Sequence, residues 1–142
     1  MQISSRFSVA VHVLALLATT PAGELLTSDR MAGSVNTNPV VIRRILGQLK
    51  KAGLVEVRAA VGGTHLRRAP ADITLLDVYY AVEVVEGSLF NIHDKPNPRC
   101  PVGRNIQAAL DDTLRRAQAA LEQQLASVSV AHVVADLGEL VA

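Results

Sequence analysis

The sequence is poor in aromatic residues and in thiols. Its 142 residues include no tryptophan, two tyrosines, two phenylalanines and a single cysteine. One cysteine cannot form an internal disulfide, which is typical of a cytoplasmic protein. Aromatics make up 3% of the chain and hydrophobic residues 49%. We therefore expect one compact domain with a core of Val, Leu, Ile and Ala.

Long apolar runs are also missing. No stretch reaches the ~20 residues that a membrane-spanning helix needs, so we expect no membrane association. The segment Val9–Ala18 follows Arg6 and superficially suggests a signal peptide. However, Val11, Leu14 and Leu17 recur at helical spacing. We interpret this segment as the first core helix rather than as a targeting signal. A short second helix, capped by Thr27, is expected to end near Gly33.

The sequence lacks the motifs of common enzymes and of metal sites. We find no glycine-rich phosphate loop, no Ser-His-Asp arrangement and no carboxylate pair in a recognisable context. A cysteine-dependent enzyme would need a base beside Cys100, and His93 is the local candidate. The other histidines, His12, His65 and His132, show no spacing typical of zinc ligands. The chain is therefore not expected to be an enzyme or to bind a metal.

Charge is unevenly distributed along the chain. Residues 1–68 contain nine Lys or Arg and three acids, whereas residues 69–142 contain five Lys or Arg and ten acids. The first part thus has a net charge of +6 and the second of −5. This pattern indicates a region that binds a polyanion, joined to a region that does not contact it.

The most informative stretch runs from Asn36 to Arg68. Asn38 is a suitable helix N-cap, Pro39 fits the first helical position, and Gly53 fits the end of the helix. Two short strands follow, predicted at 54–58 and 64–68, with glycines near the hairpin tip. A basic helix followed by a basic hairpin is typical of a winged helix-turn-helix. We predict a mainly α fold with a small β-hairpin wing.

DNA contacts are predicted at three places. The start of the third helix would meet base edges and phosphates, with Val40 against a thymine methyl group; the wing and the start of the first helix would contact the DNA backbone. Arg67 is a further wing candidate, whereas Lys51 and Arg68 are expected to be bystanders. The predicted DNA-binding residues are Ser4, Ser5, Arg6, Ser28, Thr37, Asn38, Pro39, Val40, Arg43, Arg44, Arg58, Gly62, Gly63, Thr64 and His65.

The C-terminal half predicts a dimer. After a helix that starts near Thr74 and a loop at 87–100, a long helix is expected from Pro101 to about Ser127. Its apolar residues follow a spacing close to a heptad seam. A last short helix, near 130–137, is expected to fold onto the dimer core. The predicted interface residues are Ile106, Leu110, Leu114, Ala117, Leu121, Leu125 and Val128.

Cys100 is a candidate redox sensor. It precedes Pro101 at the expected N-cap of the long helix, with Arg99 and Arg104 nearby. The helix dipole and the positive neighbours both favour the thiolate form. An inert, semi-buried cysteine is the alternative, and the sequence does not separate the two. We divide the chain into a DNA-binding region, 1–70, and a region of linker helix, sensor loop and dimerisation helix, 71–142.

Five segments, taken in order and with their spacing, form a combined pattern. They are Ser4–Phe7, Asn38–Leu54, Gly62-Gly63 with Leu66, Ile73–Val78 and Asn97–Gly103. Together they resemble the Rrf2 family of bacterial transcriptional regulators, which includes IscR-, NsrR- and CymR-like proteins. The resemblance covers nearly the whole chain and implies a homodimeric repressor that binds inverted-repeat promoter DNA.

The chain departs from the cluster-binding members of that family. Those members carry three cysteines in the loop before the long helix, whereas this chain has Cys100 alone there. An iron–sulfur cluster is normally held by several thiolates. We therefore expect no cluster and no other cofactor. The signal would be thiol oxidation or a small-molecule inducer.

A different class of function is compatible with the same charges. The basic helix and wing could bind an acidic protein partner without touching DNA. Both kinds of binding weaken with salt, so salt dependence does not separate them. Preference for one duplex sequence over a scrambled one does.

Overall fold

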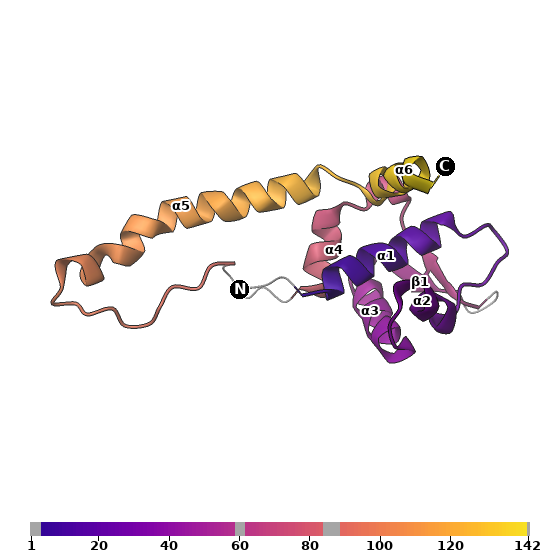
Figure 1. Ribbon diagram of the computed structural model, residues 1–142, viewed down its shortest axis with the longest axis horizontal. Coiled ribbons are helices and arrows are strands. Elements are labelled where there is room, and N and C mark those ends of the chain that lie inside the picture. Colours follow the sequence, from indigo (N-terminus) through magenta and orange to yellow (C-terminus); the bar gives the residue numbers. More distant parts are fainter. Residues whose placement is uncertain (1–3, 59–61, 84–88, 142) are drawn as a thin grey trace. The chain divides into compact units, whose positions relative to one another are not determined.

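The computed structural model describes residues 4–58, 62–83 and 89–141. These residues form six α-helices, one 3₁₀ helix and one antiparallel two-stranded sheet (Figure 1). The predicted fold class, a mainly helical protein with a β-hairpin wing, is confirmed. The elements are α1 (Arg6–Thr19), α2 (Ser28–Val35), α3 (Pro39–Lys51), β1 (Val55–Val57), β2 (Thr64–Leu66), η1 (Pro70–Asp72), α4 (Leu75–Val82), α5 (Pro101–Ala126) and α6 (Val130–Val141).

The chain divides into two compact units. The first comprises Met1–Val84 with Leu125–Ala142, and the second comprises Val85–Gln124. The predicted boundary at residue 70 does not separate them, because α4 packs on α1 and α3, and α6 packs on α1 and η1. The first residue of the last helix, Val130, is fully buried in the core of the first unit. The expected packing of this helix on a dimer core stays a prediction.

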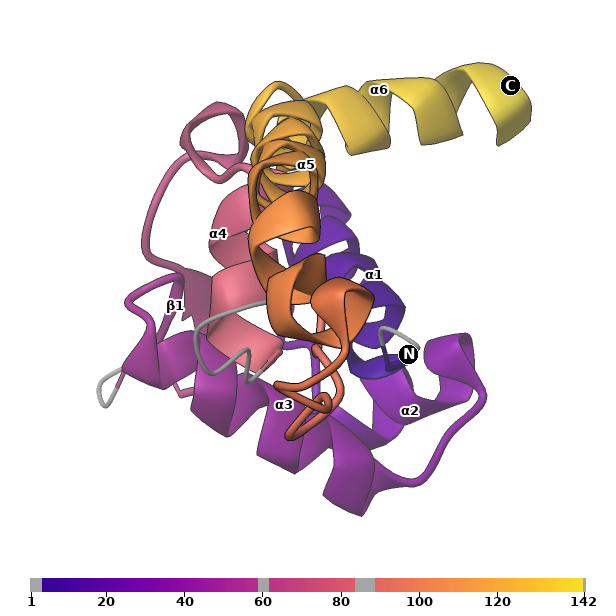
Figure 2. The ribbon, with the colours of Figure 1, turned by 90° about the vertical axis from the view of Figure 1, so that its left-hand side faces the viewer.

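The core of the first unit is aliphatic, as the composition predicts. It is built around α1, α3 and α4, which lie against one another in Figure 2. Leu14 of α1, Ile42, Ile45 and Leu49 of α3, and Val78 of α4 are fully buried in it. The buried positions of α3 are spaced by three and four residues, so one stripe of the helix faces the core and the opposite face remains outside.

Local capping signals fix the ends of α3. The side chain of Asn38 accepts a hydrogen bond from the Val40 N–H, and Pro39 opens the helix, as predicted. At the other end Gly53 has a φ of 78°, and its N–H donates to the Lys50 carbonyl. The N–H of Leu54 donates to the Leu49 carbonyl, which completes a Schellman motif. Because Leu54 still closes the helix, β1 begins one residue later than expected.

One predicted helix end is wrong. Gly33 was expected to stop α2, but the helix continues to Val35, and Asn36 adopts the left-handed conformation with φ 63°. Asparagine tolerates this conformation better than most residues with a side chain. The predicted cap of α4 is confirmed: Thr74 and Asp77 form a reciprocal capping box.

The second unit contains α5 and the segment that precedes it. The N–H of Leu89 donates to Oε1 of Gln118, so the preceding segment runs back along the helix. Near the start of α5, a β-carbon added at Gly103 would lie 2.7 Å from the Asn97 carbonyl oxygen, so only glycine permits this close approach. None of the 26 residues of α5 is buried. No helix in the described ranges is long and apolar enough to cross a membrane.

Candidate nucleic-acid interface

The outward face of α3 presents two arginines and an exposed apolar side chain. Val40, Arg43, Arg44 and Gly47 are all exposed, and their spacing places them on one side of the helix. The buried stripe on the opposite side holds this face in a fixed orientation. No acidic residue occupies the first turn of α3, so nothing there would repel a phosphate.

Some polar groups of the residues that precede α3 already make hydrogen bonds within the fold. Oδ1 of Asn38 accepts from the Val40 N–H at 2.8 Å, so a phosphate contact by this side chain would have to come from its Nδ2 group. The N–H of Thr37 donates to the Ala32 carbonyl at 3.0 Å. Ser28, the first residue of α2, is half-buried behind the Thr27 cap. The predicted contacts by these residues are not tested by the structure.

The wing is an antiparallel pair in which Glu56 lies opposite His65. Gly62 and Gly63 have φ values of 71° and 73°, as expected near a hairpin tip. Residues 59–61, where the predicted tip continues, lie outside the described part of the chain. Nε2 of His65 lies 3.0 Å from the Gly62 carbonyl oxygen. Since a carbonyl can only accept, this contact assigns the ring proton to Nε2 and ties the imidazole to the hairpin turn.

The wing tip rests against the segment between α1 and α2. A β-carbon added at Gly63 would lie 2.8 Å from a methyl carbon of Leu25, closer than real side chains permit. Arg58 donates from Nε to Glu56 Oε1 at 3.2 Å, but both side chains are about half exposed. A surface pair of this kind contributes little to stability, so the Arg58 guanidinium can exchange this partner for a phosphate at little cost.

A groove runs between α3 and the wing. It has a volume of about 240 Å³, an apolar floor and two cations, Arg43 and Lys50, at its edges. Thr64 and Arg43 were predicted at the interface, whereas Gly47 and Val57 were not. A glycine in the middle of a strongly helical run was the available signal for Gly47. The residues that line the groove are Arg43, Leu46, Gly47, Lys50, Val55, Val57 and Thr64.

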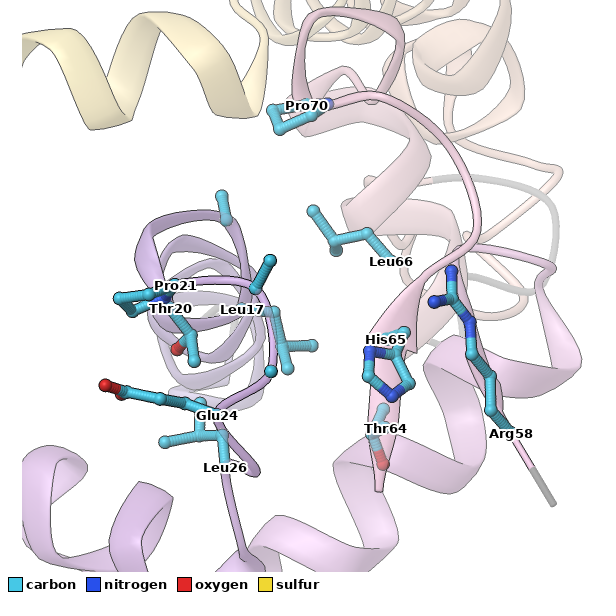
Figure 3. Close-up of a pocket in the computed structure, with 13 residues that line it drawn as sticks. Leu17, Thr20, Pro21, Glu24, Leu26, Arg58, Thr64, His65, Leu66 and Pro70 are labelled. Atoms are coloured by element: carbon cyan, nitrogen blue, oxygen red, sulfur yellow. The ribbon is translucent and has the colours of Figure 1, made fainter. Parts of the chain in front are cut away.

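A second hollow, also of about 240 Å³, lies behind the wing (Figure 3). Leu17 and Leu26 line it from the side of α1 and α2, and Leu66 lines it from β2. His65 and Arg58 stand on its wing side in Figure 3. The hollow therefore separates the wing from the end of α1, and a molecule bound there would contact three residues of the predicted interface, Arg58, Thr64 and His65.

At the start of α1, two predicted DNA contacts have internal partners. Ser4 Oγ donates to Glu83 Oε1 at 2.7 Å, which joins the start of α1 to the end of α4. Arg6 donates from Nε to the same hydroxyl at 3.1 Å. Ser5 is exposed and makes no side-chain cap bond to α1. Of these three residues, Ser5 has the side chain most readily available to a phosphate.

Cys100 lies at the N-terminus of α5 and is exposed. The backbone N–H groups of Gly103 and Val102 hydrogen-bond to its sulfur and lower the pKa of the thiol below its ordinary value. The predicted direction of this shift is therefore reproduced, although the principal donors are backbone groups rather than Arg99 or Arg104. The thiolate is the reactive form of cysteine, so this thiol is suited to react with oxidants and electrophiles.

Alkylation of Cys100 by iodoacetamide is expected to reach half of its maximal rate at a lower pH in the folded protein than in urea. Between the folded and unfolded pKa values the folded protein contains more thiolate, so it reacts faster there. Mass spectrometry of pH-jump samples would measure the rates. Because Cys100 is the only cysteine in the sequence, no other thiol contributes. Equal midpoints in both states would contradict the lowered pKa.

The residues present do not fit an iron–sulfur cluster. Such a cluster is normally held by several thiolates, and the sequence contains one cysteine. Within the described ranges, no group of three or more His, Cys, Asp or Glu side chains is arranged to hold a metal ion. A cluster would therefore need ligands beyond those that the described residues bring together.

Three comparisons place this geometry among known proteins. The Rrf2 family, described as "Iron-dependent Transcriptional regulator", matches residues 3–136. The chain is 49% identical over 132 residues to the "Putative HTH-type transcriptional regulator YwnA" of Bacillus subtilis (strain 168), covering 93% of this chain and 96% of that protein.

Solved structures agree. A crystal structure described as that of "a putative DNA binding protein" is 46% identical, with a TM-score of 0.71, and the match covers 91% of this chain and 98% of that one. CymR, described as the global cysteine regulator of B. subtilis, is 19% identical with a TM-score of 0.72, over 95% of this chain and 97% of its own. At that identity the likeness to CymR shows the fold alone.

Proposed function

The chain belongs to the Rrf2 family of transcriptional regulators, and from this we propose that it is a homodimeric repressor that binds inverted-repeat promoter DNA in the cytoplasm. The family match and its regulator relatives support a DNA-binding role. The repressor role, the dimer and the signal are the parts that go further. The repressor role rests on the resemblance to the family, whereas the dimer and the signal are each supported by a separate feature of the chain.

The observation that carries the proposal is the face of α3. Two exposed arginines lie one turn above an N-terminus that is free of acidic residues, beside a groove edged by Arg43 and Lys50. Arginine is the residue that most often reads guanine in the major groove, and helix N-termini and lysines position phosphates. The wing, with Arg58 and Thr64, supplies backbone contacts beside the helix.

The exposed apolar seam of α5 supports the dimer. Ile106, Leu114 and Leu121 are only partly covered, and Leu110 is 40% exposed. A helix of 26 residues with no buried side chain cannot be stabilised by its own unit alone. A second copy of the same seam, packed as in a coiled coil, would bury these residues. The two copies of α3 in the dimer would then contact the two half-sites of the DNA.

The signal proposed is oxidation of Cys100. Its thiolate attacks one oxygen of a peroxide; the S–O bond forms as the O–O bond breaks, and hydroxide leaves. The sulfur is oxidised to sulfenic acid and the peroxide is reduced. The product is a weaker acceptor for the N–H groups of Val102 and Gly103. The first turn of the dimer helix would change, and with it the spacing of the two recognition helices.

The test is binding to the DNA upstream of the protein's own gene, measured by fluorescence anisotropy with a scrambled duplex as control. Reduced protein is expected to prefer the upstream duplex by about 1,000-fold or more at physiological salt. Mild peroxide should abolish this preference in the wild type but leave it in Cys100→Ser.

Three other outcomes would change the proposal. If Cys100→Ser responds to peroxide like the parent protein, the thiol is not the sensor. If oxidation has no effect on binding, the search moves to small-molecule inducers, and the hollow behind the wing in Figure 3 is the first place to look. If neither the upstream DNA nor a random duplex pool yields a preferred sequence, an acidic protein partner replaces DNA.

The proposal includes no iron–sulfur cluster, since the donor set described above does not fit one. Anaerobic reconstitution with iron and sulfide tests this point by visible absorption. A stable, stoichiometric cluster would contradict it.

A further inference from the structure

The N-terminal turn of α3 exposes apolar side chains that its own fold does not require. Val40 is 53% exposed and Val41 36% exposed, although both are β-branched and neither is in the core. Polar or acidic residues would stabilise this turn better. Their oxygens can accept hydrogen bonds from the free N–H groups of the turn, and a negative charge interacts favourably with the positive end of the helix dipole. The first turn of α3 is therefore less stable than it would be with such residues.

Gly47 is a second residue of α3 that nothing within the described fold explains. It lies two turns from Val40 on the same side of the helix, with Arg43 and Arg44 between them. A β-carbon added at Gly47 would meet no atom within 4 Å. Glycine inside a helix is unfavourable relative to alanine, and no contact of Gly47 within the described fold requires it.

The combination of apolar, cationic and side-chain-free positions on one face matches the major groove of DNA. The thymine 5-methyl group is the apolar feature displayed there, beside the acceptors of guanine that arginine reads. We propose that Val40 contacts a thymine 5-methyl group in each half-site, and that Gly47 leaves room for the DNA to approach this face of α3. This inference rests on the proposed function and names the base that it recognises.

An acidic protein with apolar side chains is the competing occupant. Such a protein would complement the arginines and the valine. Its binding would not depend on the 5-methyl group of a single thymine, however. The charge of the first 68 residues and the cations at the groove edges favour DNA as the occupant. The experiment below separates the two.

The test removes only the methyl group. The preferred duplex, selected from a random pool, is remade with deoxyuridine at each thymine in turn, and Kd is measured for the wild type and for Val40→Ala. At one position per half-site, the wild type is expected to lose about fourfold in affinity, as for one buried methyl group, and about 15-fold when both half-sites are changed. Val40→Ala should bind the thymine duplex more weakly and should not respond to that replacement.

Leu137→Ala is the matched control. Leu137 is an apolar residue of α6 that is 43% exposed and lies outside the candidate interface, so its variant should respond to deoxyuridine as the wild type does. If no thymine shows a methyl effect in the wild type, or if Val40→Ala retains the effect, the inference is overturned. If no duplex is preferred at all, the proposed function fails as well. The two failures are therefore distinguishable.

Gly47→Ala provides an independent measurement. The variant is expected to melt a few degrees higher, because alanine favours the helix, and yet to bind the preferred duplex at least tenfold more weakly. Gly138→Ala, at another exposed helical glycine with open space around it, should also melt higher but bind DNA normally. Unchanged DNA affinity in Gly47→Ala would overturn the close approach at this position.

Discussion

Replacing Leu114 by glutamate is expected to convert the protein into a monomer and to weaken operator binding by about 100-fold or more. Leu114 lies in the middle of the apolar seam of α5, and a carboxylate there would have to be buried, unpaired, between two helices. A monomer loses the second half-site, and with it the gain from two linked contacts, which is typically ~10² to 10⁴. Sedimentation velocity and anisotropy on a two-half-site duplex would measure both effects.

Ala119→Glu is the matched control for Leu114→Glu. Ala119 is exposed and lies on the side of α5 opposite the seam. The substitution therefore adds the same charge to the same helix without placing it in the proposed interface. This variant should remain a dimer and bind normally. A Leu114→Glu protein that stays dimeric would show that α5 is not the interface. A monomer that binds the operator as tightly as the wild type would show that dimerisation does not support recognition.

Ile45→Ala is expected to destabilise the folded protein by about 2–5 kcal/mol. Ile45 is fully buried in the stripe by which α3 packs into the core. The substitution removes apolar contacts and leaves a cavity, and both effects contribute to the loss. Because α3 carries the recognition face, the operator affinity should fall together with the folded fraction. Urea unfolding at a fixed protein concentration would measure the change, since dimerisation couples stability to concentration.

Val41→Ala serves as the comparison for Ile45→Ala. It shortens a β-branched side chain on the same helix at a position that is partly exposed, so its effect on the free energy of unfolding should stay below about 1 kcal/mol. If the loss for Ile45→Ala were equally small, the core would have to repack around α3, and the recognition face would not be held as rigidly as the buried stripe indicates.

The helix boundaries that were predicted correctly depend on neighbours in the sequence. Asn38 and Pro39 cap α3, Gly53 ends it, and Thr74 with Asp77 caps α4. Each of these signals acts within four residues of itself. The end of α2 was missed because glycine and asparagine compete for the left-handed position, and the helix could pass Gly33 without strain.

The sequence by itself determined the winged-helix order of elements, the aliphatic core, the basic first half and the position of a single thiol at the start of the long helix. Those features arise from periodicity, caps and charge, which are local. The tertiary structure alone decided that α4 and α6 join the DNA-binding unit and that Ser4 is bonded to Glu83. It also decided that Gly47 and Val57 line one groove. These residues are distant in sequence, so only the packing of the folded chain brings them together.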